Sequence, residues 1–187
     1  MVKGCLKRVV QEMKAHPSCE WFTGNLFRFV QDSGKVSEVS WGPHCYPKIL
    51  QRGRSPIITY GPTTFFSRKI YEEVGRIDER LHYIMDIDLW LTFMERRVIN
   101  RRINCFCWAF RLHEESKTAQ YDGHGLSQKA KDQGKIEEAI VWEKHHYKVS
   151  KVLRGCVQLV RLLDGSAIRW LYYKMKYLGK PYTDIRV

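Results

Sequence analysis

The stretch "HYIMDIDLWL", residues 82–91, places two acidic side chains inside an otherwise apolar run. Burying a carboxylate is costly unless it is paired, so Asp86 and Asp88 each need a structural or a chemical role. From Asp86 to Met94 the apolar residues recur at helical spacing, which predicts a helix that begins near Asp86. Two roles for Asp86 remain open here: a cap that accepts helix N–H bonds, or a base that accepts a proton.

The sequence on the N-terminal side of this stretch predicts alternating helices and strands. Residues 4–15 have helical spacing, and residues 20–30 have the composition of a strand. "QDSGK" (31–35) supplies a tight turn, after which residues 36–41 return as a partner strand. Residues 63–75 predict a short strand that enters a helix ending at its terminal glycine.

After the central helix the hydrophobic period changes from helical to alternating. "INCFCWAFRLH" (103–113) predicts a strand with every second residue from Ile103 to His113 on one face. Small apolar side chains lead along that face to Arg111 and then His113. Such a face begins in a core and ends at a polar site.

The rest of the chain predicts three amphipathic helices. Their apolar stripes are Ile136, Ile140, Val141 and Tyr147; then Leu153, Cys156, Val157, Val160 and Leu163; then Ile168, Leu171, Tyr172, Met175 and Leu178. Residues 151–187 carry eight Lys or Arg against two Asp, which is half of the net charge of the chain. We therefore divide the chain into an α/β domain at 1–128 and basic amphipathic C-terminal helices at 129–187.

Composition restricts the class of protein. With 187 residues and 44% hydrophobic content, the chain can bury a sizeable core. Its formal net charge of +12 suits a phosphate-bearing partner: an anionic lipid, a sugar nucleotide or a nucleic acid. We rank nucleic acid last and do not expect it, because the basic residues cluster on the C-terminal helices and no nucleic-acid-binding motif is recognisable.

The sequence also predicts a location. Six cysteines occur without a CxxC pair, and the opening "MVKGCLKRVVQEMK" is charged rather than a signal peptide. No apolar run approaches the roughly 20 residues that span a bilayer. We expect a cytoplasmic protein with reduced cysteines, peripheral at the inner face of the membrane through its basic helices.

Residues 62–118 resemble the acceptor-side part of family 2 glycosyltransferases, which have the GT-A fold. The motifs are "FFSRK…EEVG", "IDERLHYIMDIDLWL" and "AFRLHEESKT", and the upstream "GCLKRVVQEMKAHP…TGNLFRFVQDSGKV" is also similar to that family. The resemblance implies an α/β fold: a partial GT-A-like mixed sheet with flanking helices, here followed by a helical C-terminal extension.

The resemblance implies roles on the acceptor side of a transfer site. Asp86 matches the general base that takes the proton from the acceptor hydroxyl, and a carboxylate is ionised at neutral pH without a large pKa shift. Asp88 and Trp90 would support substrate binding, as a structural helper and as a packing surface beneath the acceptor. Core packing explains Trp90 equally well.

The resemblance also implies roles on the diphosphate side. Arg111 would stabilise charge on the leaving nucleoside diphosphate, and His113 could ligate a divalent metal, Mn²⁺ or Mg²⁺. Ser116 and Lys117 match the adjacent loop, which folds over the phosphates. The implied reaction is inverting transfer of a sugar from a nucleotide-sugar donor to a glycan or lipid-linked acceptor.

Departures from the family pattern limit these expectations. Thr92 stands where the family has Arg, and Gly61 stands where it has Gln. The nucleotide-binding half with its DxD carboxylates has no counterpart in this sequence, so we expect a truncated or split enzyme, silent without a donor-binding half. Missing strands would expose a sheet edge and favour a protein partner or self-association. The alternative is a non-catalytic remnant that binds a membrane surface or a partner.

Overall fold

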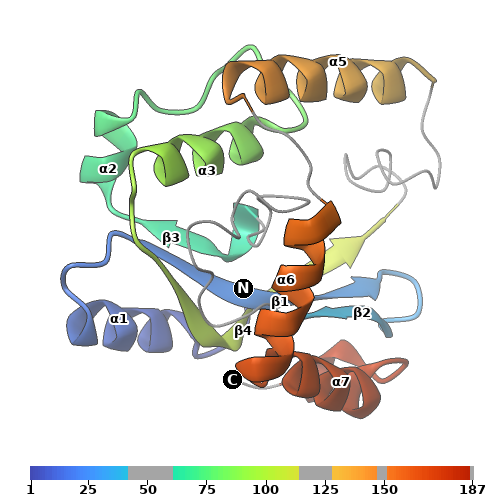
Figure 1. The fold of residues 1–187 in the computed structure, drawn as a ribbon. Helices are drawn as coiled ribbons and strands as arrows, with labels where there is room; N and C mark the ends of the chain where they lie inside the picture. The colour runs from blue at the N-terminus through green and yellow to red at the C-terminus, as the bar shows by residue number, and fades with distance from the viewer. Residues whose placement is uncertain (42–60, 114–127, 147–150, 186–187) are drawn as a thin grey trace.

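The computed structural model describes residues 1–41, 61–113, 128–146 and 151–185, which form a mixed α/β structure around a four-stranded sheet (Figure 1). Its elements are α1 (Cys5–Ala15), β1 (Trp21–Val30), β2 (Val36–Ser40), η2 (Gly61–Thr63), β3 (Thr64–Phe66), α2 (Arg68–Glu73), α3 (Met85–Glu95), β4 (Asn100–Leu112), α5 (Gln128–Lys144), α6 (Lys151–Leu163), α7 (Ser166–Tyr177) and η3 (Tyr182–Asp184).

The long strand β1 organises the sheet, because it pairs with each of the other three strands. It is antiparallel to β2 and β3 and parallel to β4. The predicted hairpin between β1 and β2 is confirmed, with Gly34 at a positive φ in its turn. The predicted strand–helix unit β3–α2 is also confirmed, and Gly75 takes a φ of 92° just after the helix, where a side chain would be strained.

In the strand β4, the alternating residues whose side chains face α1 change partway along the strand. Ile103, Cys105 and Cys107 pack in one cluster with α1, whereas Ala109 packs with Phe106 in the cluster beneath α7. The predicted alternation along one face is therefore wrong beyond Cys107. The pairing of β4 with β1 contains bulges: from Thr23 to Leu26 β1 advances three residues, whereas β4 advances six, from Arg102 to Trp108. An odd number of extra residues in β4 moves its later side chains to the other face of the sheet.

A glycine and a buried polar group accommodate this bulged crossing. The Sγ and Cβ atoms of Cys107 lie too close to the position that a Cβ at residue 24 would take, so only glycine fits there without a shift. The buried guanidinium of Arg102 donates to the Gly24 carbonyl and to the Asn25 side-chain oxygen, both at 2.9 Å. The Asn25 amide donates in turn to the carbonyls of Ile103 and Cys105, at 3.3 Å each. These bonds satisfy polar groups that the bulge removes from the ladder.

The helix α3 lies between the sheet and α5 (Figure 1). Leu89, Trp90 and Phe93 pack toward β1 and β3, where Trp90 stacks on Trp21 at 5.6 Å between ring centroids. Leu91 packs on the opposite side with the α5 residue Val141. Because both faces are covered, α3 is apolar around most of its circumference, as expected for a buried helix.

The helix α7 covers the opposite end of the sheet. Its Trp170 indole donates to the Val39 carbonyl at 3.0 Å, and Tyr173 stacks on Trp41 at 4.5 Å between ring centroids. Tyr177 joins the same buried cluster. One face of α7 thus completes the core beneath β2. In Figure 1, α3 and α5 are drawn toward the top of the view, α1 toward the lower left and α7 toward the lower right.

Candidate functional site

The N-terminal turn of α3 contains Asp86, which the sequence leaves open as a cap or a base and which the family resemblance matches to a base. Ile84 is the N-cap residue and makes no side-chain cap bond, so Asp86 is not the cap itself. Its Oδ1 accepts a hydrogen bond from the Ile87 amide at 2.9 Å, and the side chain is partly buried. The carboxylate therefore takes one of the unpaired N–H groups of the first turn, where the helix dipole favours a negative charge.

The second acid of the stretch, Asp88, lies in an ionic cluster between α3 and α5, in which Asp88 and His145 are buried and Lys144 and Glu95 are exposed. Asp88 is only 2% exposed. Lys144 Nζ lies 2.8 Å from both carboxylate oxygens, and His145 Nε2 lies 2.9 Å from Oδ1. On the other side of its ring, His145 Nδ1 lies 2.8 Å from Glu95 Oε1. The cluster ties the C-terminal end of α5 to the middle of α3.

The charges in this cluster stabilise one another. Burial alone would raise the pKa of Asp88, but hydrogen bonds from His145 and Lys144 outweigh burial, and the pKa is lowered. Burial likewise would lower the pKa of His145, but its bonds to Asp88 and Glu95 raise the pKa above the ordinary 6.5. The two carboxylates thus favour the protonated form of the imidazole between them.

A second carboxylate from α5 binds the chain just before α3. Glu137 is 1% exposed, and its Oε2 accepts hydrogen bonds from the amides of His82, Tyr83 and Ile84 at 3.0, 2.8 and 3.4 Å. Burial alone would raise the pKa of Glu137, but these three hydrogen bonds and one from the Gln133 side chain outweigh the effect of burial, so the pKa is lowered. The carboxylate occupies a nest of three successive N–H groups and fixes where α3 begins.

The polar contact face of α5 corrects the predicted stripe. Ile136 and Ile140 are exposed, whereas Val141 is buried as predicted, and Tyr147 lies outside the described residues. The buried face of this helix holds Glu137, Val141 and the side chain of His145. These three residues follow at intervals of four along one helix face. The surface that α5 covers carries backbone amides and Asp88, so carboxylate and imidazole groups suit it better than isoleucine.

The sequence contained a signal for this cluster that periodicity in apolar residues alone does not detect. Glu137, Val141 and His145 share one face because residues four apart stack along a helix. An acid and a base on that face, matched to the two acids of the 82–91 stretch, would have indicated ionic docking of α5 on α3.

The other predicted site residues occupy different surroundings. Trp90 is buried in the aromatic cluster with Trp21, and its indole nitrogen has no hydrogen-bond partner within the described part of the chain. Arg111 is exposed near the C-terminal end of β4, and His113 follows that strand, partly buried. Ser116 and Lys117 lie outside the described residues.

The ends of α3 and β4 that contain the predicted acceptor residue and the predicted diphosphate residue lie on the same side of the molecule. In Figure 1 the N-terminal end of α3 and the C-terminal end of β4 both lie toward the right of the view. Asp86 is on the first of these ends and Arg111 on the second. In the described ranges, no group of three or more His, Cys, Asp or Glu side chains is arranged to hold a metal ion.

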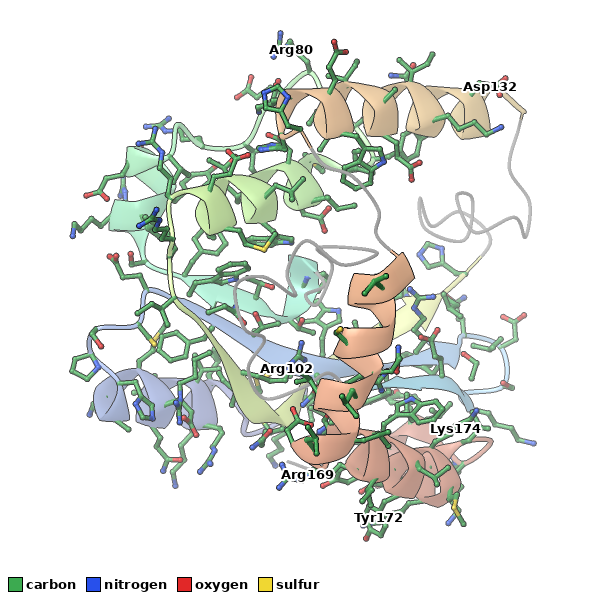
Figure 2. The ribbon with its side chains drawn as sticks, viewed as in Figure 1. Arg80, Arg102, Asp132, Arg169, Tyr172 and Lys174 are labelled. Atoms are coloured by element: carbon green, nitrogen blue, oxygen red, sulfur yellow. The ribbon has the colours of Figure 1, made fainter. Side chains whose placement is uncertain are left out.

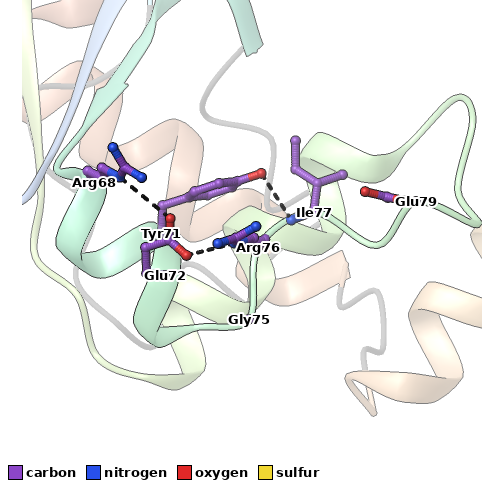
Figure 3. A pocket seen from close by; sticks show the side chains of 7 residues that line it. All are labelled: Arg68, Tyr71, Glu72, Gly75, Arg76, Ile77 and Glu79. Atoms are coloured by element: carbon purple, nitrogen blue, oxygen red, sulfur yellow. Dashed lines mark hydrogen bonds and ion pairs between the residues drawn. The ribbon is translucent and has the colours of Figure 1, made fainter.

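A surface pocket of about 750 Å³ opens beside α2 (Figure 3). It is lined by Arg68, Tyr71, Glu72, Gly75, Arg76, Ile77 and Glu79. Arg76 Nε lies 2.6 Å and Arg68 Nε 3.6 Å from the Glu72 carboxylate, and the Tyr71 hydroxyl accepts from the Ile77 amide at 3.4 Å. None of the residues predicted from the sequence lines this pocket, and both arginines are already paired with Glu72.

Comparison with known family models and with curated proteins finds no match to this chain. The glycosyltransferase expectation therefore rests on the motifs of this sequence and on the geometry of the residues that they contain.

Proposed function

We propose that this chain supplies the acceptor side of an inverting glycosyltransferase, with Asp86 as the general base. One observation carries the proposal: Asp86 and Asp88, two residues apart, have different environments. Asp88 is buried and bound to Lys144 and His145, which suits a structural acid. Asp86 lies in the first turn of α3, partly buried and bonded to the Ile87 amide.

The proposed chemistry needs one base and a stabilised leaving group. The Asp86 carboxylate takes the proton of an acceptor hydroxyl as that oxygen forms a bond to the anomeric carbon. The bond between the anomeric carbon and the diphosphate oxygen breaks with its electron pair leaving on the diphosphate, and the configuration inverts. Arg111, at the end of β4, would balance the charge of the leaving group.

The polar contacts between α5 and the α3 region, made by Glu137 and Asp88, support this role because a base must be held in position. Glu137 fixes the three amides that precede α3, and Asp88 fixes the helix two residues after Asp86. Groups that act as general bases must lie within hydrogen-bonding reach of the proton they accept. In this proposal Asp88 and Glu137 are positioning residues.

The donor side of the reaction is assigned to a segment that this sequence does not contain. His113 could offer one imidazole to a divalent ion, Mn²⁺ or Mg²⁺, and the DxD carboxylates of that segment would complete the site. When bound, such an ion supplies positive charge to the leaving diphosphate. The donor would be a nucleotide sugar, and the acceptor a glycan or a lipid-linked glycan.

A second candidate function is a non-catalytic module at a membrane surface. It is favoured by a separate observation, the apolar residues left exposed on α6 and α7 beside basic residues. Membrane binding alone does not separate the two candidates, since an enzyme that uses a lipid-linked acceptor also works at a membrane; the absence of sugar transfer would distinguish the non-catalytic module.

The proposal is tested in the cell that encodes the chain, because the donor-binding half and the acceptor that the proposal requires would be present there. Membranes from a strain lacking the gene are incubated with radiolabelled nucleotide sugars, with and without the purified chain. We expect incorporation of one sugar to fall on deletion and to be restored by the chain. Unchanged incorporation of every sugar on deletion would contradict the proposal.

A further inference from the structure

We propose that α6 and α7 form a docking surface for an anionic membrane, and this inference does not depend on sugar transfer. No helix of the described residues is long and apolar enough to cross a bilayer. A helix that lies in the membrane interface needs only an apolar face of sufficient size and a charged border. Both features are present here.

Large apolar side chains on these two helices point into solvent. On α7, Ile168, Leu171, Tyr172 and Met175 are exposed, and the last is 76% exposed. They follow the spacing i, i+3, i+4 and i+7, which is one face of a helix. The opposite face, with Trp170, Tyr173 and Tyr177, is the one that packs on the core. The exposed stripe is therefore a second apolar face of α7, which the described part of the chain leaves uncovered.

The neighbouring helix α6 also carries exposed apolar side chains. Val152, Leu159, Leu162 and Leu163 are exposed, with Leu163 at 80%. On the inner side, the Arg161 guanidinium donates to the Trp41 carbonyl at 3.4 Å and lies 5.9 Å from the Trp170 ring centroid. The helix therefore turns Arg161 inward and Leu159, Leu162 and Leu163 outward, the reverse of the usual pattern in which the apolar side of a surface helix faces its own domain.

Cations border the exposed face of α7 on both sides. At 100° per residue, Arg169 and Lys176 fall on one flank of the stripe and Lys174 on the other. Figure 2 shows Tyr172 pointing away from the sheet, with Arg169 and Lys174 on either side of the helix. Lys176 Nζ lies 5.6 Å from the Tyr172 ring centroid, so the ammonium and the aromatic ring share one border of the face.

These charges identify the partner as an anionic lipid surface rather than a second copy of the chain. A dimer across this face would bring two sets of lysine and arginine together, in a protein whose formal net charge is already +12. At a membrane the same side chains reach the lipid phosphates while their stems and the apolar stripe enter the acyl boundary.

The test is flotation of the full chain with vesicles of phosphatidylcholine, alone or mixed with phosphatidylglycerol, at low and high salt. We expect binding to the mixed vesicles only, weakened by salt. Met175→Glu should reduce that binding at least about tenfold, because it removes an inserted side chain and adds a like charge to the lipid. Ile136→Glu on α5 is the control, since it adds the same charge at an exposed isoleucine and should change binding far less.

Loss of a bordering cation provides a second, milder test. Arg169→Gln and Lys176→Gln should each reduce binding about fivefold, whereas Lys14→Gln on α1 should not. Circular dichroism confirms that each variant is folded, and Leu163→Glu replaces Met175→Glu if the latter unfolds. Equal binding to both vesicle types, no binding to either, or a stable dimer in light scattering that is broken by Met175→Glu would overturn the proposal.

Discussion

Glu137 of α5 accepts a hydrogen bond from the Tyr83 amide at 2.8 Å, although the two residues lie 54 positions apart in the sequence. Two neighbouring amides bond to the same oxygen. A single buried carboxylate therefore joins the outer helix to the segment that leads into the proposed base. The position of Asp86 depends on a helix that the 82–91 stretch alone does not reveal.

Replacement of Glu137 should weaken this junction. Glu137→Ala leaves three amides without their acceptor, and we expect the free energy of unfolding to fall by about 3 kcal/mol. Urea denaturation followed by tryptophan fluorescence measures the change. Glu143→Ala, at an exposed position of the same helix, is the control and should change stability by less than about 0.5 kcal/mol. Equal effects of the two substitutions would show that the amide nest contributes nothing.

Stability should depend on pH through His145 and its two carboxylates. The pKa of His145 is raised, so its contribution is complete below 6.5 and is lost as pH rises through the higher folded value. The pKa values of Asp88 and Glu137 are lowered, so their contributions are present above 3.8 and 4.5 and are lost as pH falls through the folded values. We expect maximal stability between these limits.

The variant His145→Asn isolates the alkaline part of this profile. It should be less stable than the wild type at about pH 5.5, where an ordinary histidine is mostly protonated. It should lose little further stability as the pH rises to about 8, where an ordinary histidine is mostly neutral. Thermal melts across the range provide the measurement. An alkaline decline of the same size in the variant would assign that decline to other groups.

The glycine at the bulge should not tolerate a methyl group. Gly24→Ala directs its Cβ into the Sγ and Cβ atoms of Cys107, so we expect it to destabilise the fold by about 2 kcal/mol or more. Gly155→Ala is the matched control: it is in helix α6 with open space around it, and it should stabilise by about 0.5–1 kcal/mol. Chemical denaturation of both variants decides whether the close approach of the strands is as tight as described.

Local patterns predicted the elements that depend on local chemistry. The hairpin at Gly34, the helix stop at Gly75 and the helix start beside Asp86 follow from turn residues and apolar spacing, and each is confirmed within about two residues. The mixed α/β class follows from the same pattern. Its assignment to the GT-A fold stays a proposal.

Tertiary contacts decided what the local patterns could not predict. The bulge in β4 reverses the face of Ala109, because Cys107 must pass over Gly24. The helix α5 buries Glu137 instead of Ile136, because the surface that it covers is rich in N–H donors. In both cases the deciding partner lies more than 50 residues away in the sequence, where no window of local spacing extends.

The central claim is that Asp86 is a base and Asp88 a structural acid, and the two amide variants separate these roles. Asp86→Asn should fold with a loss of stability of no more than about 1 kcal/mol, from its lost charge at the helix N-terminus, and should reduce the initial rate of sugar incorporation into membranes by about 10²–10⁴-fold. Asp88→Asn should lower the free energy of unfolding by about 2 kcal/mol, because His145 and Lys144 lose their shared carboxylate, and should reduce the rate of the folded protein far less. A folded Asp86→Asn variant that restores incorporation at the wild-type rate would contradict the account.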